Sequence, residues 1–287
     1  MPGLGRRGAD EVALGLKLQP VAPRQGWTWV RDGTRLFLRR PLGFTTMFLL
    51  FLLASTAWLM LPVVGLIALA TLPLLSLGFM IASRSVLRGG LAHPGQFVEP
   101  LVGDARQRRH LLMLCGLYGV GALVVVVVSG WVYGDALDAL RKAMAEHGAS
   151  SPEAIEATAD PRISNGMFSF AVLATALSVP FWHAPALVWW GRQSAWQALF
   201  SSTLGMWRAK GAYLIYGLAW LLASAAMSLV VGLLAGLLGA RGFLVLLVPV
   251  MALTLSTAFY VSLWFSFVDS FGSPDEEPPA TGLSTAA

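Results

Sequence analysis

Long apolar runs without a single Asp, Glu, Lys or Arg alternate with charged segments along this chain. The longest run, from Pro41 to Ser83, would reach about 65 Å as one helix at about 1.5 Å per residue. A hydrocarbon core is about 30 Å thick, so this run has to cross a membrane twice. Pro62 and Gly65 mark the reversal, because proline interrupts a helix and glycine tolerates a turn. The pattern predicts two spans, at about 44–62 and 63–82.

Four further runs are each long enough to span alone, at about 111–133, 167–190, 211–238 and 243–268. Their continuous apolarity favours helices over barrel strands, which alternate at a period of two residues. We therefore predict an all-α integral membrane protein with six transmembrane helices in a membrane domain covering residues 26–271. Residues 1–25 are predicted to be a disordered cytoplasmic N-terminus, and residues 272–287 a disordered acidic tail.

Charge sets the expected orientation. Lys and Arg gather before the first run, between the second and third, and between the fourth and fifth, whereas acids prevail in the loop from about 134 to 166. The positive-inside rule then puts both termini in the cytoplasm. The same rule explains the net charge of +5, so nucleic acid is not an expected partner. Membrane lipids are the expected partners.

An amphipathic stretch precedes the first, third and fifth spans. Apolar residues recur at helical spacing from Trp27 to Phe37, from Phe97 to Ala105 and from Trp196 to Trp207, each with basic residues nearby. Such faces suit cytoplasmic interfacial helices. The arrangement is open to two interpretations: a threefold repeat of an interfacial helix plus a hairpin, or three unrelated hairpins that each begin with a basic flank.

His183 is the only histidine inside a predicted span. An ionisable group within a membrane is a functional hypothesis by default, so we consider a cavity lined by His183 and Trp182. Pro180 and Pro185 flank this pair and free backbone groups that need partners. The alternative is that His183 satisfies these backbone groups or reaches the headgroups.

Motifs for enzyme chemistry are absent from the sequence. It contains no H-E-x-x-H, no G-x-S-x-G, no phosphate-binding loop and no His and Cys cluster at metal-ligand spacing. We expect no catalytic residues, no cofactor, no metal and no enzyme activity. His93, Glu99, Asp104 and His110 could form a site that acts on lipid headgroups, but the grouping is unspecific and a wetted amphipathic segment is the favoured explanation.

Small residues recur every four positions along the fifth span. They are Ser224, Ser228, Gly232, Gly236 and Ala240. Such stripes let helix backbones approach closely in lipid. The stripe is predicted to be a helix-packing face, toward another span or toward a second copy of the chain.

Several segments look familiar, including Gly26-Trp27-Thr28-Trp29-Val30, Leu75-Ser76-Leu77-Gly78-Phe79-Met80 and Phe181-Trp182-His183-Ala184-Pro185. They resemble an uncharacterised family of proteobacterial six-helix inner-membrane proteins that is distantly similar to YciC-type proteins. The resemblance covers about residues 20–272 and implies a bacterial plasma-membrane location. It implies no activity and no functional residue.

Three functions stay open at this point. The first is a non-catalytic scaffold or envelope accessory that binds a protein partner or another copy of itself. The second is a permease or channel-like protein for a neutral or lipophilic solute, because ion coupling needs charged groups that the spans lack. The third is an enzyme acting on lipid headgroups at the cytoplasmic face.

Overall fold

The computed structural model describes residues 16–59, 68–148, 151–237 and 241–275, with side chains described up to residue 55 in the first stretch and from residue 247 onward in the last. These residues form α-helices and one 3-10 helix, and no strand occurs among them. The helices are α2 (Gln25–Arg39), α3 (Pro41–Leu59), α5 (Leu72–Leu87), η1 (Pro94–Phe97), α6 (Glu99–Val102), α7 (Ala105–Tyr133), α8 (Ala136–His147), α9 (Pro152–Thr158), α10 (Pro161–Phe181), α11 (Ala184–Trp189), α12 (Ala195–Arg208), α13 (Lys210–Leu237) and α14 (Arg241–Phe271).

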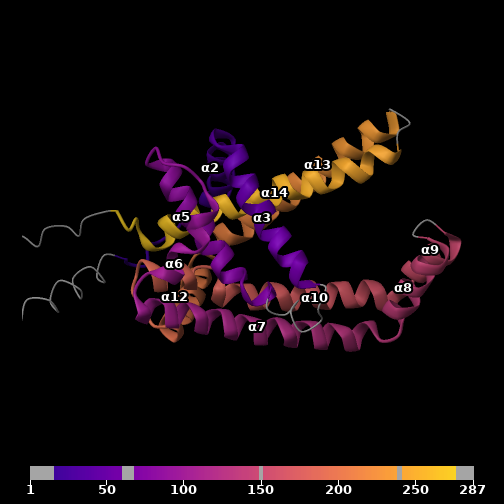
Figure 1. The fold of residues 1–287 in the computed structure, drawn as a ribbon, viewed down its shortest axis with the longest axis horizontal. Coiled ribbons are helices and arrows are strands. Elements are labelled where there is room, and N and C mark those ends of the chain that lie inside the picture. The colour runs from indigo at the N-terminus through magenta and orange to yellow at the C-terminus, as the bar shows by residue number, and fades with distance from the viewer. Residues whose placement is uncertain (1–15, 60–67, 149–150, 238–240, 276–287) are drawn as a thin grey trace, which may run out of the picture.

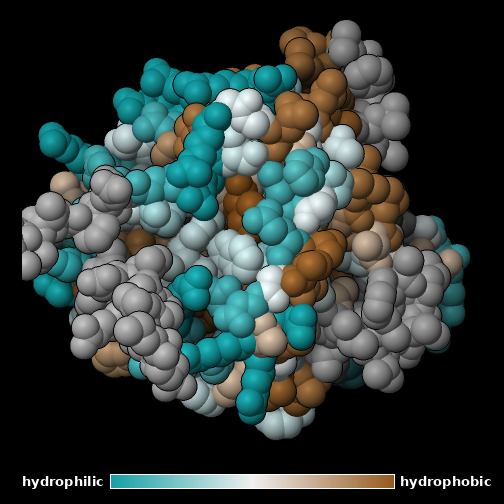
Figure 2. Space-filling view, turned by 60° about the vertical axis from the view of Figure 1, so that its left-hand side comes forward, coloured by the Kyte–Doolittle hydropathy of each residue, from teal (hydrophilic) through white to brown (hydrophobic). Residues whose placement is uncertain are grey.

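Two helical hairpins extend from a packed base. Helices α7 and α10 run side by side and lead to α8 and α9 at their far end, while α13 and α14 project in another direction (Figure 1). Helices α2, α5, α6 and α12 gather near the opposite end, which we call the base. Seen from that side, hydrophilic residues cover much of the base and hydrophobic surface lies beside it (Figure 2).

The core of the base is formed where α5, α11 and α14 meet. Buried Leu77 and Met80 of α5, Leu187 of α11, and Trp264 and Phe267 of α14 belong to one cluster. Helices α7 and α12 add residues to it, and so does the N-terminal segment before α2 through Leu16 and Leu18. That segment lies within the stretch predicted to be disordered, of which residues 1–15 fall outside the described chain.

The six-span prediction is only partly met. Four described helices are long and apolar enough to cross a membrane, and a fifth span results if the bent pair of α2 and α3 is taken together. Helix α5 is a shorter apolar helix. It begins at Leu72, nine residues after the predicted start at 63, and Pro73 stands in its first turn. The predicted reversal at Pro62 and Gly65 lies outside the described residues.

The interfacial-helix prediction needs a correction at α2. This helix meets α3 at 97°, as an interfacial helix would, but its apolar face packs against α13 and α14. Trp29, Val30, Leu36 and Phe37 are buried there, whereas Trp27 is exposed. Two glycines permit this contact: a Cβ on Gly26 would lie 2.1 Å from the Ala212 carbonyl oxygen, and one on Gly33 would lie 2.3 Å from the Cβ of Ser262.

The other two amphipathic stretches differ from each other. Residues 97–105 do not form one helix, because η1, α6 and the start of α7 divide them. Helix α12 buries its small residues and leaves its large apolar side chains exposed, including Trp196, Phe200 and Trp207. Of the three stretches, α12 therefore retains the exposed apolar face that an interfacial helix requires.

Candidate functional site around His183

His183 lies at a break within the fourth predicted span. Helix α10 ends at Phe181 and α11 begins at Ala184, because Pro185 has no N–H to donate to the carbonyl one turn earlier. Ser202 of α12 satisfies two backbone groups at the break. It accepts a hydrogen bond from the His183 N–H at 3.0 Å and donates one to the Val179 carbonyl at 3.3 Å.

The imidazole of His183 is fully buried. Its Nε2 lies 2.6 Å from the hydroxyl oxygen of Tyr213, and that hydroxyl lies 3.3 Å from the Oγ of Ser270. The rings of Phe267 and Phe271 pack against it with centroids 5.7 and 5.5 Å away. Its Nδ1 has no hydrogen-bond partner among the described residues. The imidazole is thus enclosed by aromatic rings and held by one hydroxyl.

A second polar cluster joins α2 to α13 and α14 beside this histidine. The Asp269 Oδ2 accepts hydrogen bonds from the indole N–H of Trp29 at 2.8 Å and from the Gln25 amide at 2.9 Å. The hydroxyls of Tyr216 and Ser262 are 2.6 Å apart. Asp269 is half-buried, and a carboxylate partly removed from water without such donors would be costly, so these contacts explain why α2 is held at this place.

Asp269 was not singled out from the sequence as a structural residue. One sequence signal could have found the interface. Gly26 and Gly33 are seven residues apart and share a helix face with Trp29 and Val30, which marks a close helix contact rather than a headgroup surface.

Trp182 faces a different space from His183. It lines a central cavity of about 190 Å³ between α5, α7, α10 and α14, whereas His183 does not. The aromatic walls of this cavity also carry Ser76, Tyr118, Ser178 and Tyr260. The indole N–H of Trp182 is buried and has no partner among the described residues. The structure therefore separates the two residues that the sequence grouped as one cavity.

The small-residue stripe on α13 lies on an exposed side of the helix in its described part. Ser228, Gly232 and Gly236 are exposed, and a Cβ on either glycine would meet no atom within 4 Å. Within this chain α13 instead buries Ala212, Tyr216, Ala219, Val231 and Ala235. Ser224 is half-buried, and Ala240 lies outside the described residues. A packing role for the stripe stays a prediction.

The residues considered for headgroup chemistry are not joined by any hydrogen bond in the described chain. The backbone N–H of His93 donates to Gln96 at 3.0 Å, and Asp104 caps the start of α7 by accepting from the Arg106 N–H at 3.2 Å. No group of three or more His, Cys, Asp or Glu side chains with the geometry of a metal site occurs among the described residues.

Comparison with known proteins finds a similar membrane protein. The chain is 32% identical over 281 residues to a probable inner membrane protein of Burkholderia thailandensis, and the match covers 93% of this chain and 98% of that protein. No protein-family profile and no solved structure matches the chain. The match agrees with the resemblance to an uncharacterised family of proteobacterial membrane proteins.

Proposed function

Because the chain belongs to the same family as the probable inner membrane protein of Burkholderia thailandensis, we propose that it is an integral inner-membrane protein that acts as a non-catalytic scaffold or envelope accessory. The enclosed His183 carries this proposal. A transport or catalytic imidazole has to meet its substrate, whereas this one is fully buried and is fixed by Tyr213 in the packed base. The site stabilises a junction of α10, α11, α12, α13 and α14.

We further propose six crossings arranged as three hairpins, with both termini in the cytoplasm. Helix α5 would then be a short crossing paired with α3. Each segment that precedes a hairpin packs against the hairpin before it: α2 against α13 and α14, η1 against α5 and α3, and α12 against α10 and α11. Because α2, which precedes the first hairpin, packs against the last one, the order closes into a cycle, and this favours the threefold repeat.

The helix ends support the same repeat. The second helix of each hairpin is followed by a residue in the left-handed region: Gly89 after α5, Arg192 after α11 and Gly272 after α14, with φ of 85°, 51° and 89°. Such residues commonly end helices by satisfying the last carbonyls. Three equivalent helix ends at the base are what a threefold unit would require.

Reporter fusions test the orientation. Fusions at about residues 95, 150, 200 and 275 should read inside, outside, inside and inside. An inside reading at 150 would overturn the proposed topology, whatever the activity of the protein.

Proteoliposomes test the function. The scaffold proposal expects the purified chain to leave the permeability of vesicles to glycerol, urea and a lipophilic dye unchanged, and expects His183→Ala to lower thermal stability without altering permeability. A flux that needs the protein and disappears in His183→Ala would refute it. Leu222→Ala is the matched control, because this exposed side chain lies on α13 away from the base.

A permease for a neutral or lipophilic solute is the second candidate, and the central cavity is the observation that favours it. Its aromatic walls with a few hydroxyl-bearing residues suit a small amphiphilic solute. In that case Tyr118→Phe, which removes a hydroxyl and keeps the aromatic ring, should reduce the flux, while His183→Ala should affect it only through stability. An unchanged flux in Tyr118→Phe would count against this candidate.

A further inference from the structure

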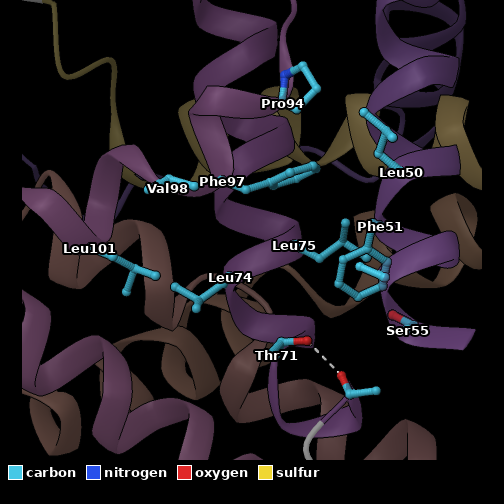
Figure 3. Close-up of a pocket in the computed structure, with 12 residues that line it drawn as sticks. Leu50, Phe51, Ser55, Thr71, Leu74, Leu75, Pro94, Phe97, Val98 and Leu101 are labelled. Atoms are coloured by element: carbon cyan, nitrogen blue, oxygen red, sulfur yellow. Dashed lines mark hydrogen bonds between the residues drawn. The ribbon is translucent and has the colours of Figure 1, made fainter. Parts of the chain in front are cut away.

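An apolar groove of about 360 Å³ lies between α3, α5 and the η1–α6 segment. Leu50 and Phe51 line it from α3, Leu74 and Leu75 from α5, and Phe97 from η1 (Figure 3). Its volume is in the range of about 300–1,000 Å³ typical of ligand pockets. Polar groups are confined to one end, where Ser55 and Thr71 lie and the Thr71 hydroxyl already donates to the Ala68 carbonyl at 2.7 Å.

The groove is a consequence of how η1 is held. The Phe97 ring lies directly on α5 at Gly78, where a Cβ would come within 2.1 Å of the ring. The ring also packs against Phe79 and Phe51, with centroids 5.8 and 6.4 Å away. Because η1 is wedged against α5 in this way, α3 and α5 contact each other at few positions, and the described residues leave an apolar groove between them.

An exposed cation contacts the backbone of a residue that lines this groove. Leu101 lines the groove, and the guanidinium of Arg108 reaches back to 3.4 Å from the Leu101 carbonyl oxygen. Arg108 makes no ion pair within the described chain, and its neighbours Arg106 and Arg109 are also exposed without one. Asp104, an acid close to Arg108 in the sequence, instead accepts a hydrogen bond from the Arg106 N–H at the start of α7. Most of the guanidinium donors of Arg108 are therefore available to an anion.

We propose that this groove binds an anionic phospholipid, with one acyl chain between α3, α5 and η1 and the phosphate bound by Arg108. An acyl chain fits the nearly pure hydrocarbon lining, and a guanidinium binds phosphate through two parallel N–H donors. Basic pockets beside membrane helices select anionic headgroups in the same way. The inference concerns a different surface from the His183 site and does not depend on the proposed scaffold function.

Photo-crosslinking in defined bilayers tests the proposal. The full chain is placed in nanodiscs of phosphatidylcholine that contain a small fraction of phosphatidylglycerol with a diazirine in one acyl chain. We expect label on the peptides that carry Phe51, Leu74 and Val98, and about fivefold less label when the probe is phosphatidylcholine with the same acyl group. Equal labelling by the two probes, or label spread over the outer helices alone, would overturn it.

Variants separate the chain site from the headgroup site. Ala54→Trp fills the groove and should abolish the label, and Ala68→Phe does the same from another wall. Arg108→Gln should reduce phosphatidylglycerol labelling about fivefold, to the phosphatidylcholine level. Leu222→Trp on exposed α13 and Arg141→Gln on exposed α8 are matched controls that should label normally. Labelling that persists in a folded groove-filled variant would refute the site.

Competition provides a readout that needs no variant. Unlabelled phosphatidylglycerol should displace the probe from the wild-type chain, whereas unlabelled phosphatidylcholine should not. Displacement by both lipids to the same extent would refute headgroup selection.

Discussion

The Nε2 atom of His183 lies 2.6 Å from the hydroxyl oxygen of Tyr213, although 30 residues separate them along the chain. This contact ties the break between α10 and α11 to the start of α13. Through Tyr213 it continues to Ser270 on α14. A histidine that the sequence marks as a candidate for chemistry thus becomes the centre of a junction at the base.

Removing the Tyr213 hydroxyl should destabilise this junction. In Tyr213→Phe the buried Nε2 of His183 loses its partner, and we expect a loss of about 1 kcal/mol in unfolding free energy, typical of hydrogen bonds between membrane helices. Thermal or denaturant unfolding in nanodiscs measures it. The control is Tyr133→Phe, whose hydroxyl makes no hydrogen bond within the described residues. Equal stability of the two variants would show that the contact contributes nothing.

Close approach of α2 to α14 predicts a strong effect at Gly33. A Cβ there would lie 2.3 Å from the Cβ and 2.6 Å from the Cα of Ser262, so Gly33→Ala forces the helices apart. Overpacking of this kind costs about 1–3 kcal/mol. Gly217→Ala on α13 is the matched control, because its Cβ meets no atom within 4 Å and alanine favours a helix by about 0.5–1 kcal/mol. An unchanged unfolding free energy in Gly33→Ala would contradict the close packing of α2 against α14.

Bulky residues in the small-residue stripe should leave the folded chain intact. A Cβ at Gly232 or Gly236 would meet no atom within 4 Å, so in Gly232→Leu and Gly236→Leu we expect the unfolding free energy to fall by no more than about 0.5 kcal/mol, or to rise by up to about 1 kcal/mol through the better helix propensity of leucine. If the stripe packs against a second copy, energy transfer between labelled copies in bilayers should fall in both variants. Marked destabilisation without any change in self-association would show that the stripe packs within the chain.

Asp275 holds the start of the tail against the base. Its carboxylate pairs with Arg84 and Arg88, and Arg84 also lies 5.8 Å from the centre of the Trp190 ring. The hydrogen bond from Arg84 lowers the pKa of this carboxyl below its ordinary value of 3.8. The pKa of Asp275 is lower in the folded chain than in the unfolded chain. The ion pairs therefore stabilise the fold fully above pH 3.8, and this stabilisation is lost as the pH falls through the lowered pKa.

Label mobility checks this pH dependence. A fluorophore attached through Ser273→Cys, in a chain that also carries Cys115→Ala, should show constant anisotropy from about pH 5 to 8 and a fall below about pH 4. Adding Asp275→Asn should give low anisotropy throughout. A tail that is equally mobile with and without the carboxylate would mean that the ion pairs do not hold it.

Several local features could be predicted because they depend on neighbouring residues. The bounds of α7, α13 and α14 lie close to the predicted spans, since charge-free runs and their charged flanks define them. Proline placement likewise predicted backbone groups that need partners near His183. Which group satisfies them could not be predicted, because Ser202 comes from another helix.

The site itself depended on contacts that sequence spacing does not record. Trp182 and His183 are adjacent in the chain, yet the helix break turns one toward the central cavity and the other into the base. The amphipathic face of α2 suits a lipid surface and a protein surface equally well by its pattern. Gly26, Gly33 and the Trp29–Asp269 hydrogen bond decide between them, and these act between segments more than 180 residues apart.

By itself, the sequence determined that this chain is helical and membrane-embedded. Long charge-free runs indicate segments that lie in a bilayer, and a continuously apolar segment satisfies its backbone groups there by forming a helix. The tertiary structure alone decided that His183 is enclosed, that α2 packs into the protein and that a groove opens beside Phe97. Each of these depends on the distances between helices, and those distances are set by small residues and hydrogen bonds contributed from distant parts of the chain.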